Sequence, residues 1–167
     1  QQEDDLGLVF LYHRHQKFFL TFFRDIPRLQ TIAEAHRRVG FAREALPVYQ
    51  TMLMQAGRER EPLLFAQGET YVEAGDLREA VQTLKAYRIL YPRGTSAERA
   101  GTLILETLYK LRDSNGVIAF TSAEGAAMDD GPGAARIIAD SYLQAGQREK
   151  AKEVYPIYVE FSPYGVC

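Results

Sequence analysis

Three glycines stand at equivalent points of three similar segments, and this register constrains the fold more than any other feature. Gly40 and Gly75 are 35 residues apart, and Gly75 and Gly146 are 71 apart, close to two such periods. Six further positions agree in type when the segments are aligned on these glycines. Counted from each glycine, they are a small residue at −7 (Ala33, Gly68, Ala139), a ring at −4 (His36, Tyr71, Tyr142), an alanine at +5 (Ala45, Ala80, Ala151), large residues at +9 (Tyr49, Leu84, Tyr155) and +12 (Met52, Tyr87, Tyr158), and a helix breaker at +17 (Gly57, Pro92, Pro163). The chain is therefore expected to contain structural repeats.

The repeated pattern predicts a hairpin of two α-helices. Glycine ends the first helix because it enters the left-handed region without steric cost. Asp76 and Glu79 are placed to cap the start of the next helix. Small residues allow the two helices to approach closely, and the final proline ends the second helix. One such hairpin cannot bury its apolar face alone, so neighbouring hairpins are expected to stack.

This pattern resembles the tetratricopeptide repeat, most closely at Tyr71, Gly75, Ala80 and Pro92. The resemblance covers about residues 26–57, 61–93 and 133–164. It implies an all-α fold, a right-handed α-α superhelix of about three clear repeats with one degenerate repeat and an N-terminal helix.

Residues 95–130 occupy the place of the degenerate repeat. Thr95 and Glu98 have the spacing of a capping box, leucines follow at helical spacing, and residues 113–116 (DSNG) favour a turn. The segment lacks the tyrosine, glycine and alanine set, so the sequence leaves its register open. Residues 131–133 (GPG) are expected to separate it from the last repeat.

Pro47 and Pro156 fall inside predicted second helices. A proline in a helix interior removes a backbone donor and clashes with the carbonyl four residues earlier. We expect both helices to be kinked. The kinks are either tolerated on an outer face or used to direct the repeats toward a partner.

Both ends of the chain are unusually apolar. Residues 1–24 are interpreted as an N-terminal apolar helix, followed by a repeat domain over residues 25–167. A helix that is apolar nearly all round needs burial on more than one side. The interface candidates, which would meet another subunit, a partner or a preceding repeat, are Phe18, Phe19, Phe22 and Phe23 at this end and Tyr158, Phe161 and Tyr164 at the other. Alternatively, the first segment folds back as a cap, or the sequence is an excerpt of a longer chain.

Charge and cysteine usage exclude several classes of protein. The net charge is −2 with no cluster of basic residues, which argues against nucleic-acid binding. Cys167 is the only cysteine, so neither an internal disulfide nor a thiolate metal cluster can form. The apolar stretches fall far short of the roughly 20 residues of a membrane helix. The absence of an initiator methionine indicates a removed leader or an excerpt.

No catalytic, cofactor or metal site is expected, and the chain is interpreted as a non-enzyme. His13 and His15 diverge by about 200° on a helix, so they cannot chelate one metal locally. Residues 131–133 lack the lysine and the preceding strand of a phosphate-binding loop.

The resemblance implies that the first helix of each hairpin lines a groove for a peptide. Four carboxylates at equivalent positions of these helices would form an acidic ladder that suits a basic peptide. The groove candidates are Glu34, Phe65, Glu69, Glu106, Arg136 and Asp140. Alternatively, the charges are ordinary helix-surface pairs such as Glu34 with Arg38. The carboxylate clamp of some relatives is not matched.

The sequence favours a scaffold or adaptor that binds a protein or peptide partner and organises an assembly. Residues 91–100 (YPRGTSAERA) are similar to repeat junctions in bacterial envelope proteins, which suggests a periplasmic or envelope location. The alternatives are a cytoplasmic chaperone or regulator of a client peptide, and an accessory domain of a larger enzyme or export protein. The sequence does not decide whether the chain forms homo-oligomers or whether the full-length chain contains further repeats.

Overall fold

The computed structural model describes residues 2–22, 25–124 and 132–156. It divides into two compact units, residues 1–96 and residues 97–167. Every regular element within the described ranges is an α-helix, as the repeat pattern predicts. We describe each unit by itself.

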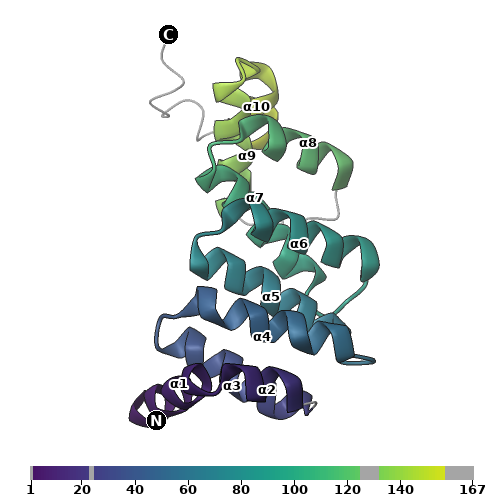
Figure 1. Cartoon of the computed structure of the whole chain (residues 1–167). Coiled ribbons are helices and arrows are strands. Elements are labelled where there is room, and N and C mark those ends of the chain that lie inside the picture. The colour runs from purple at the N-terminus through teal and green to yellow at the C-terminus, as the bar shows by residue number, and fades with distance from the viewer. Residues whose placement is uncertain (1, 23–24, 125–131, 157–167) are drawn as a thin grey trace. The chain divides into compact units, whose positions relative to one another are not determined.

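The first unit contains an N-terminal pair of helices and two helical hairpins (Figure 1). α3 pairs with α4 and α5 pairs with α6, while α4 also packs against α5 and α1 packs against α3. The helices are α1 (Gln2–Arg14), α2 (Gln16–Phe22), α3 (Ile26–Arg38), α4 (Ala42–Gln55), α5 (Arg60–Ala74) and α6 (Leu77–Leu90).

The second unit contains two further hairpins. α7 and α8 form one hairpin, α9 and α10 form the next, and α9 packs against both α7 and α8. Its helices are α7 (Ala97–Lys110), α8 (Ser114–Glu124), α9 (Pro132–Gln144) and α10 (Arg148–Val154).

All four hairpins turn in the same way. Gly40, Gly75 and Gly146 have positive φ angles of 85°, 78° and 72°, which confirms the role predicted for these glycines. In the second hairpin, the Asp76 amide donates to the Tyr71 carbonyl and the Gly75 amide to the Val72 carbonyl. This pair of bonds is the Schellman motif, which satisfies the last carbonyls of the first helix.

The structure also gives the register of the degenerate hairpin. Arg112 has a φ of 56°, and the Asp113 amide donates to the Leu108 carbonyl at 3.0 Å. Arg112 therefore occupies the address that glycine fills elsewhere. A residue's address is its position relative to the turn residue of its hairpin, which is Gly40, Gly75, Arg112 or Gly146.

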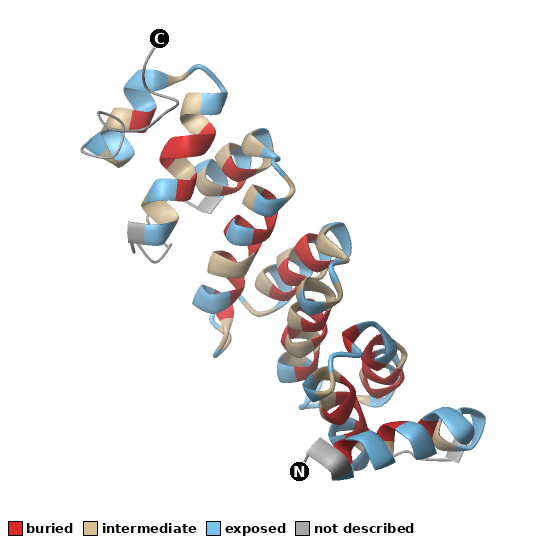
Figure 2. Ribbon diagram, turned by 90° about the vertical axis from the view of Figure 1, so that its left-hand side faces the viewer, coloured by how far each residue is buried: buried red, intermediate tan, exposed pale blue. Residues whose placement is uncertain are grey.

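Close contact at the small residues holds the helices of a hairpin together. A Cβ atom placed on Gly68 would lie 2.6 Å from Leu84 Cδ2, so only glycine fits this contact between α5 and α6 without a shift. Ala33, Ala45, Ala80, Ala139 and Ala151 are fully buried. Figure 2 shows the buried residues gathered on the facing sides of the helices.

A hydrogen-bond network fixes the segment that follows α6. The Tyr87 hydroxyl donates to Glu61 Oε1 at 3.0 Å and accepts from the Ser96 amide at 3.1 Å. The Thr95 amide donates to the same Glu61 oxygen at 2.9 Å. Burial raises the pKa of Tyr87, so the hydroxyl keeps its proton for this bond. Glu61 lies in the first turn of the first helix of the hairpin, and Tyr87 lies at address +12 of the second.

Both predicted helix caps differ from the structure. Asp76 holds the N-cap position of α6, but its carboxylate accepts from Arg43 Nη2 instead of capping the helix. α7 begins at Ala97, one residue later than a Thr95 cap requires. The amide and hydroxyl of Thr95 instead point to Glu61. In both cases, a charged side chain from another helix binds the residue that was expected to cap the helix.

The two prolines have different outcomes. α4 continues through Pro47, and Thr51 Oγ1 donates to the Pro47 carbonyl at 2.9 Å. α10 ends at Val154, because Tyr155 before Pro156 is extended with φ −148° and ψ 76°. A proline disfavours the helical conformation of the residue that precedes it. The helix expected to continue through Pro156 is therefore interrupted at Tyr155, directly before Pro156.

The N-terminal segment is two helices and not one. α1 and α2 are separated at His15, whose amide is shared between the Leu11 and Tyr12 carbonyls. Asp5 of α1 accepts two 2.7 Å bonds from Arg38 of α3, and the hydrogen bonds from Arg38 lower the pKa of Asp5. This paired contact fixes α1 against the first hairpin.

Candidate functional site

Three of the groove candidates, Glu34, Glu106 and Arg136, line two surfaces, one in each unit. In the first unit, α3 and α5 form a charged depression lined by Glu34, Arg37, Arg38 and Glu73. In the second unit, α7 and α9 form a cavity of about 390 Å³. All four helices are first helices of their hairpins, which is where the family resemblance places a groove.

Arg37 dominates the depression between α3 and α5. Its Nε donates to Glu73 Oε2 at 2.8 Å, its Nη2 lies 3.8 Å from Glu69 Oε2, and its Nη1 reaches the Tyr49 hydroxyl at 3.4 Å. The hydrogen bond to Glu73 raises the pKa of Arg37 further above its usual range. Two carboxylates and a phenol thus hold this guanidinium within its own unit.

The cavity between α7 and α9 has an apolar floor and a charged rim. Leu105, Ala134 and Ile137 line the floor, with Thr102, Tyr109 and Gly133 beside them. Glu106, Lys110 and Arg136 line the rim. In the part of the chain that the structure describes, these three charged groups have no hydrogen bond or ion pair between them or with other residues. All three side chains are exposed, so their charges are available to a ligand.

The same pair of addresses brings a polar contact between successive first helices in both units, an ion pair in one and a hydrogen bond in the other. Arg37 and Tyr109 lie at address −3 of their first helices. Glu69 and Asp140, respectively, lie at address −6 of the first helix that follows. Arg37 lies against Glu69, and the Tyr109 hydroxyl donates to Asp140 Oδ2 at 2.9 Å. These bonds join successive first helices beneath the grooves.

The four carboxylates of the predicted acidic ladder are not equally available. Asp140 is only 2% exposed and accepts from Tyr109, and Glu69 lies by Arg37. Glu34 accepts from Gln30 at 2.9 Å and lies 3.6 Å from Arg38. Glu106 alone of the four is exposed without a partner among the described residues.

Phe65 was predicted to offer an apolar contact on the groove. Its side chain is 6% exposed, and its ring lies 5.5 Å from that of Tyr87 inside the second hairpin. The predicted ring at address −4 also varies, since His36 is fully buried whereas Tyr71 and Tyr142 are half-buried. Arg136, the remaining groove candidate, lies on the rim of the second-unit cavity.

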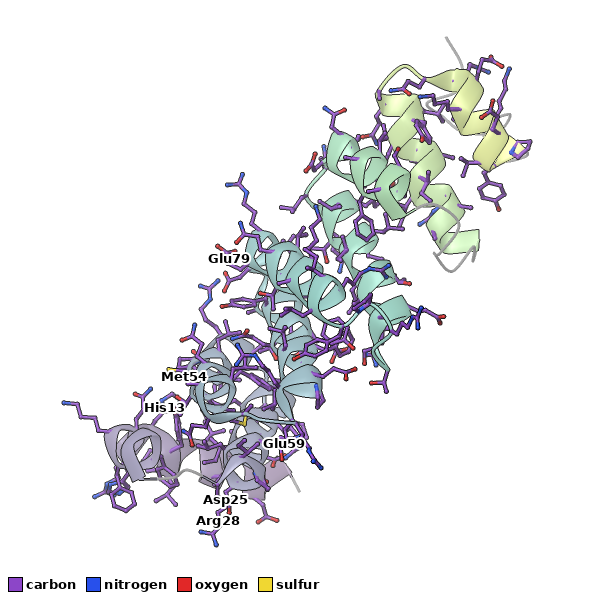
Figure 3. All side chains as sticks on the ribbon, turned by 90° about the vertical axis from the view of Figure 1, so that its right-hand side faces the viewer. His13, Asp25, Arg28, Met54, Glu59 and Glu79 are labelled. Carbon is purple, nitrogen blue, oxygen red and sulfur yellow. The ribbon has the colours of Figure 1, made fainter. Side chains whose placement is uncertain are left out.

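The interface candidates are described only in part. Phe18 is exposed, and Phe19 is half-buried with its ring 5.8 Å from Tyr12. The side chain of Phe22 and all of Phe23, Tyr158, Phe161 and Tyr164 lie outside the described residues. Phe10 and Met54 are further exposed apolar side chains, and Figure 3 labels Met54 on α4.

The histidines do not form a metal centre with carboxylates or cysteine within the described ranges, where no group of three such ligands occurs. His36 is fully buried, its Nδ1 donates to the Ile32 carbonyl at 2.7 Å, and its ring lies 5.2 Å from that of His13. Burial lowers the pKa of His36. None of the described helices is long and apolar enough to span a bilayer.

Residues 63–93, which cover most of α5 and all of α6, match the model of the tetratricopeptide repeat. The chain contains a tetratricopeptide repeat and has the fold of tetratricopeptide-repeat proteins. The turns at Gly40, Arg112 and Gly146 show that the other hairpins share its local geometry.

Two solved structures resemble the chain at low sequence identity. The C-terminal part of a tetratricopeptide-repeat protein from Cytophaga hutchinsonii aligns with a TM-score of 0.63 and 12% identity, covering 97% of this chain and 62% of that one. The chain therefore spans under two-thirds of that structure. Kinesin light chain-like tetratricopeptide repeats from Podospora anserina align with a TM-score of 0.57 and 13% identity, covering 98% of this chain and 99% of theirs. No curated protein matches the chain significantly.

Proposed function

We propose that this chain is a protein-interaction module that binds a segment of a partner in the cavity between α7 and α9. The observation that carries the proposal is the combination of an apolar floor with three charged rim groups that have no partner among the residues described. Binding sites typically join apolar walls with a few polar groups that fix orientation. Tetratricopeptide-repeat folds are typically non-enzymatic interaction modules, which supports the same conclusion.

The charges of the rim favour a partner segment that carries a carboxylate beside an apolar side chain. Lys110 and Arg136 contribute two positive charges, and Glu106 contributes one negative charge. A basic partner, which the acidic ladder suggested, would have to rely on Glu106, because the other three carboxylates are already paired or buried. Both partner types fit a scaffold or a client-binding regulator. The narrower idea of a bacterial envelope assembly rests only on residues 91–100.

Site-specific crosslinking tests the interaction role. A photoreactive amino acid at Thr102, within the cavity, should capture a discrete partner in cells that express the protein, and Arg136→Glu should abolish the product. The same label at exposed Met54 on α4 is the matched control. Equal products at both positions, or no loss with Arg136→Glu, would contradict the proposal.

The charge preference can be measured with two synthetic peptides of alternating leucine and glutamate or leucine and lysine. We expect the glutamate peptide to bind more tightly, by about fivefold for each rim cation engaged, and to weaken as salt rises. Lys110→Glu should reduce its affinity, whereas exposed Arg78→Glu on α6 should not. Tighter binding of the lysine peptide, lost with Glu106→Lys, would instead support the basic partner.

A further inference from the structure

α1 has the register of a second helix. Its buried residues Asp5, Val9 and Tyr12 have the spacing of Ala80, Leu84 and Tyr87, which stand at addresses +5, +9 and +12 of α6. They also match the fully buried or nearly fully buried Ala45, Tyr49 and Met52 of α4. Within the described residues, α1 packs against α3 and α2 but has no first helix of its own hairpin.

The residue at address +6 is buried in α4 and α6 but exposed in α1. Leu46 of α4 and Val81 of α6 stand at address +6 and are 7% and 8% exposed. Leu6 stands at the same address of α1 and is 49% exposed. Phe10 and Leu11 lie farther along the helix and are also exposed, so an apolar face of α1 is uncovered.

A second, independent observation concerns the hydroxyl at address +12. Tyr87 donates to Glu61, a residue from the start of the first helix of its own hairpin. Tyr12 is fully buried, and its hydroxyl makes no hydrogen bond of good geometry within the described residues. Burial raises the pKa of Tyr12 more than the nearby Gln16 side chain lowers it. A buried hydroxyl without a partner costs free energy. In the second hairpin, the acceptor at this address is supplied by the first helix, through Glu61.

We propose that the face of α1 carrying Leu6 and Phe10 seats a first helix of the tetratricopeptide type from outside residues 1–167. The arriving helix carries a small residue against α1 and, seven residues earlier, a carboxylate that accepts from Tyr12. Gly68 and Glu61 of α5 have this spacing and make these two contacts with α6. This interaction surface is separate from the cavity between α7 and α9, so the two proposals can fail independently.

A synthetic peptide of residues 60–75, the sequence of α5 with its turn glycine, is a suitable probe. It is titrated to about 1 mM into the isotopically labelled chain while backbone amide resonances are followed, since this range detects even weak binding. We expect resonance shifts at Leu6, Val9 and Tyr12. A peptide with Gly68→Leu should bind at least tenfold more weakly, because the added side chain prevents close approach.

Variants of the chain identify the residues of α1 that bind the peptide. Leu6→Asp should weaken binding at least tenfold, whereas Met54→Asp, at an 80% exposed site on α4, should leave it unchanged. Phe10→Asp provides a second test at a 70% exposed position, where the fold is not at risk. Tyr12→Phe should weaken binding of the unmodified peptide about fivefold but leave binding of a Glu61→Ala peptide unchanged.

The pattern of results decides the proposal. Shifts confined to α1 with the expected losses support it. Binding that is insensitive to Leu6→Asp and Phe10→Asp, or the absence of shifts in α1 at the highest peptide concentration, would overturn it. If the peptide displaces α5 instead, the shifts will concentrate at Leu84 and Tyr87, which would also overturn it.

Discussion

Tyr12 and Tyr87 occupy the same address in two second helices, yet their hydroxyl groups have opposite situations. Both rings are fully buried. Tyr87 joins α5 to the segment after α6 through Glu61 and the Ser96 amide, whereas the Tyr12 hydroxyl has no partner among the described residues. The same residue type therefore contributes differently to stability, depending on what the neighbouring helix supplies.

A matched pair of substitutions measures this difference. Tyr87→Phe should lower the free energy of unfolding by about 1–2 kcal/mol, because Glu61 and the Ser96 amide lose a buried partner. Tyr12→Phe should leave it unchanged or raise it by up to about 1 kcal/mol, because only an unpaired hydroxyl is removed. Urea denaturation of the two variants provides the comparison. Equal losses would mean that the Tyr12 hydroxyl is satisfied in solution.

Gly68 and Gly7 allow a second matched comparison, because both lie inside helices but only Gly68 is at a close contact. Gly68→Ala should destabilise the protein by about 1–3 kcal/mol, since the added methyl group would overlap Leu84 in the buried core. Gly7→Ala should stabilise α1 by about 0.5–1 kcal/mol, because nothing lies within 4 Å and alanine is the better helix former. Thermal unfolding shows whether each substitution raises or lowers the stability of the protein. A stabilising Gly68→Ala would show that α5 and α6 can separate without loss.

The hairpin turn is the element that recurs most faithfully, even where its sequence does not. Arg112 has the left-handed conformation that three glycines have elsewhere, and the same two backbone bonds close the turn. A residue with a Cβ atom is strained in this conformation by about 1–2 kcal/mol. The packing of α7 and α8 thus imposes a conformation that arginine does not prefer.

Arg112→Gly should therefore stabilise the protein. We expect a gain of about 0.5–1 kcal/mol, since the relief of strain exceeds the added entropy of the unfolded chain. Arg112 is exposed, so no packing is lost. The reciprocal control, Gly75→Ala, should cost about 1 kcal/mol or more. Both changes can be read from urea midpoints, and a loss with Arg112→Gly would argue that the arginine side chain stabilises the turn.

The helices and the turns of three hairpins could be predicted from the sequence, because glycine and alanine occupy positions where geometry admits little else. The turn predicted at residues 113–116 was wrong, since α8 begins at Ser114 and the turn lies at Arg112, where the sequence has no glycine. The second-unit groove could not be predicted fully. Address −3 of the first helices holds Arg37, Val72, Tyr109 and Leu143, which share no chemical type, so Tyr109 carried no signal. The burial of Asp140 and the pairing of Glu69 depend on contacts between helices. A carboxylate at a repeated address therefore does not by itself reveal whether it faces a partner.

At the scale of the molecule, hairpins stack within each of its two units, so the loss of one layer removes support from its neighbour in that unit. The layer formed by α1 and α3 contains His36, which is buried beside Tyr12 and His13, and whose Nε2 has no partner in the part of the chain that is described. Burial is the main cause of its lowered pKa, to which the nearby His13 adds, while the bond to the Ile32 carbonyl and the Glu44 carboxylate oppose it. The first unit consequently contains a group that resists protonation only while folded.

This group should make stability depend on pH in a defined direction. Because the pKa of His36 is lower in the folded state than its ordinary value of 6.5, the unfolded chain binds the proton first as the pH falls. The full contribution of neutral His36 is therefore present above about pH 6.5 and is lost below it. The Asp5–Arg38 pair acts in a separate window, because the lowered pKa of Asp5 affects stability only below about its ordinary value of 3.8. Urea titrations between pH 8 and pH 5 should show falling stability in the parent chain and a flatter profile in His36→Phe. An unchanged slope in that variant would assign the dependence to another group.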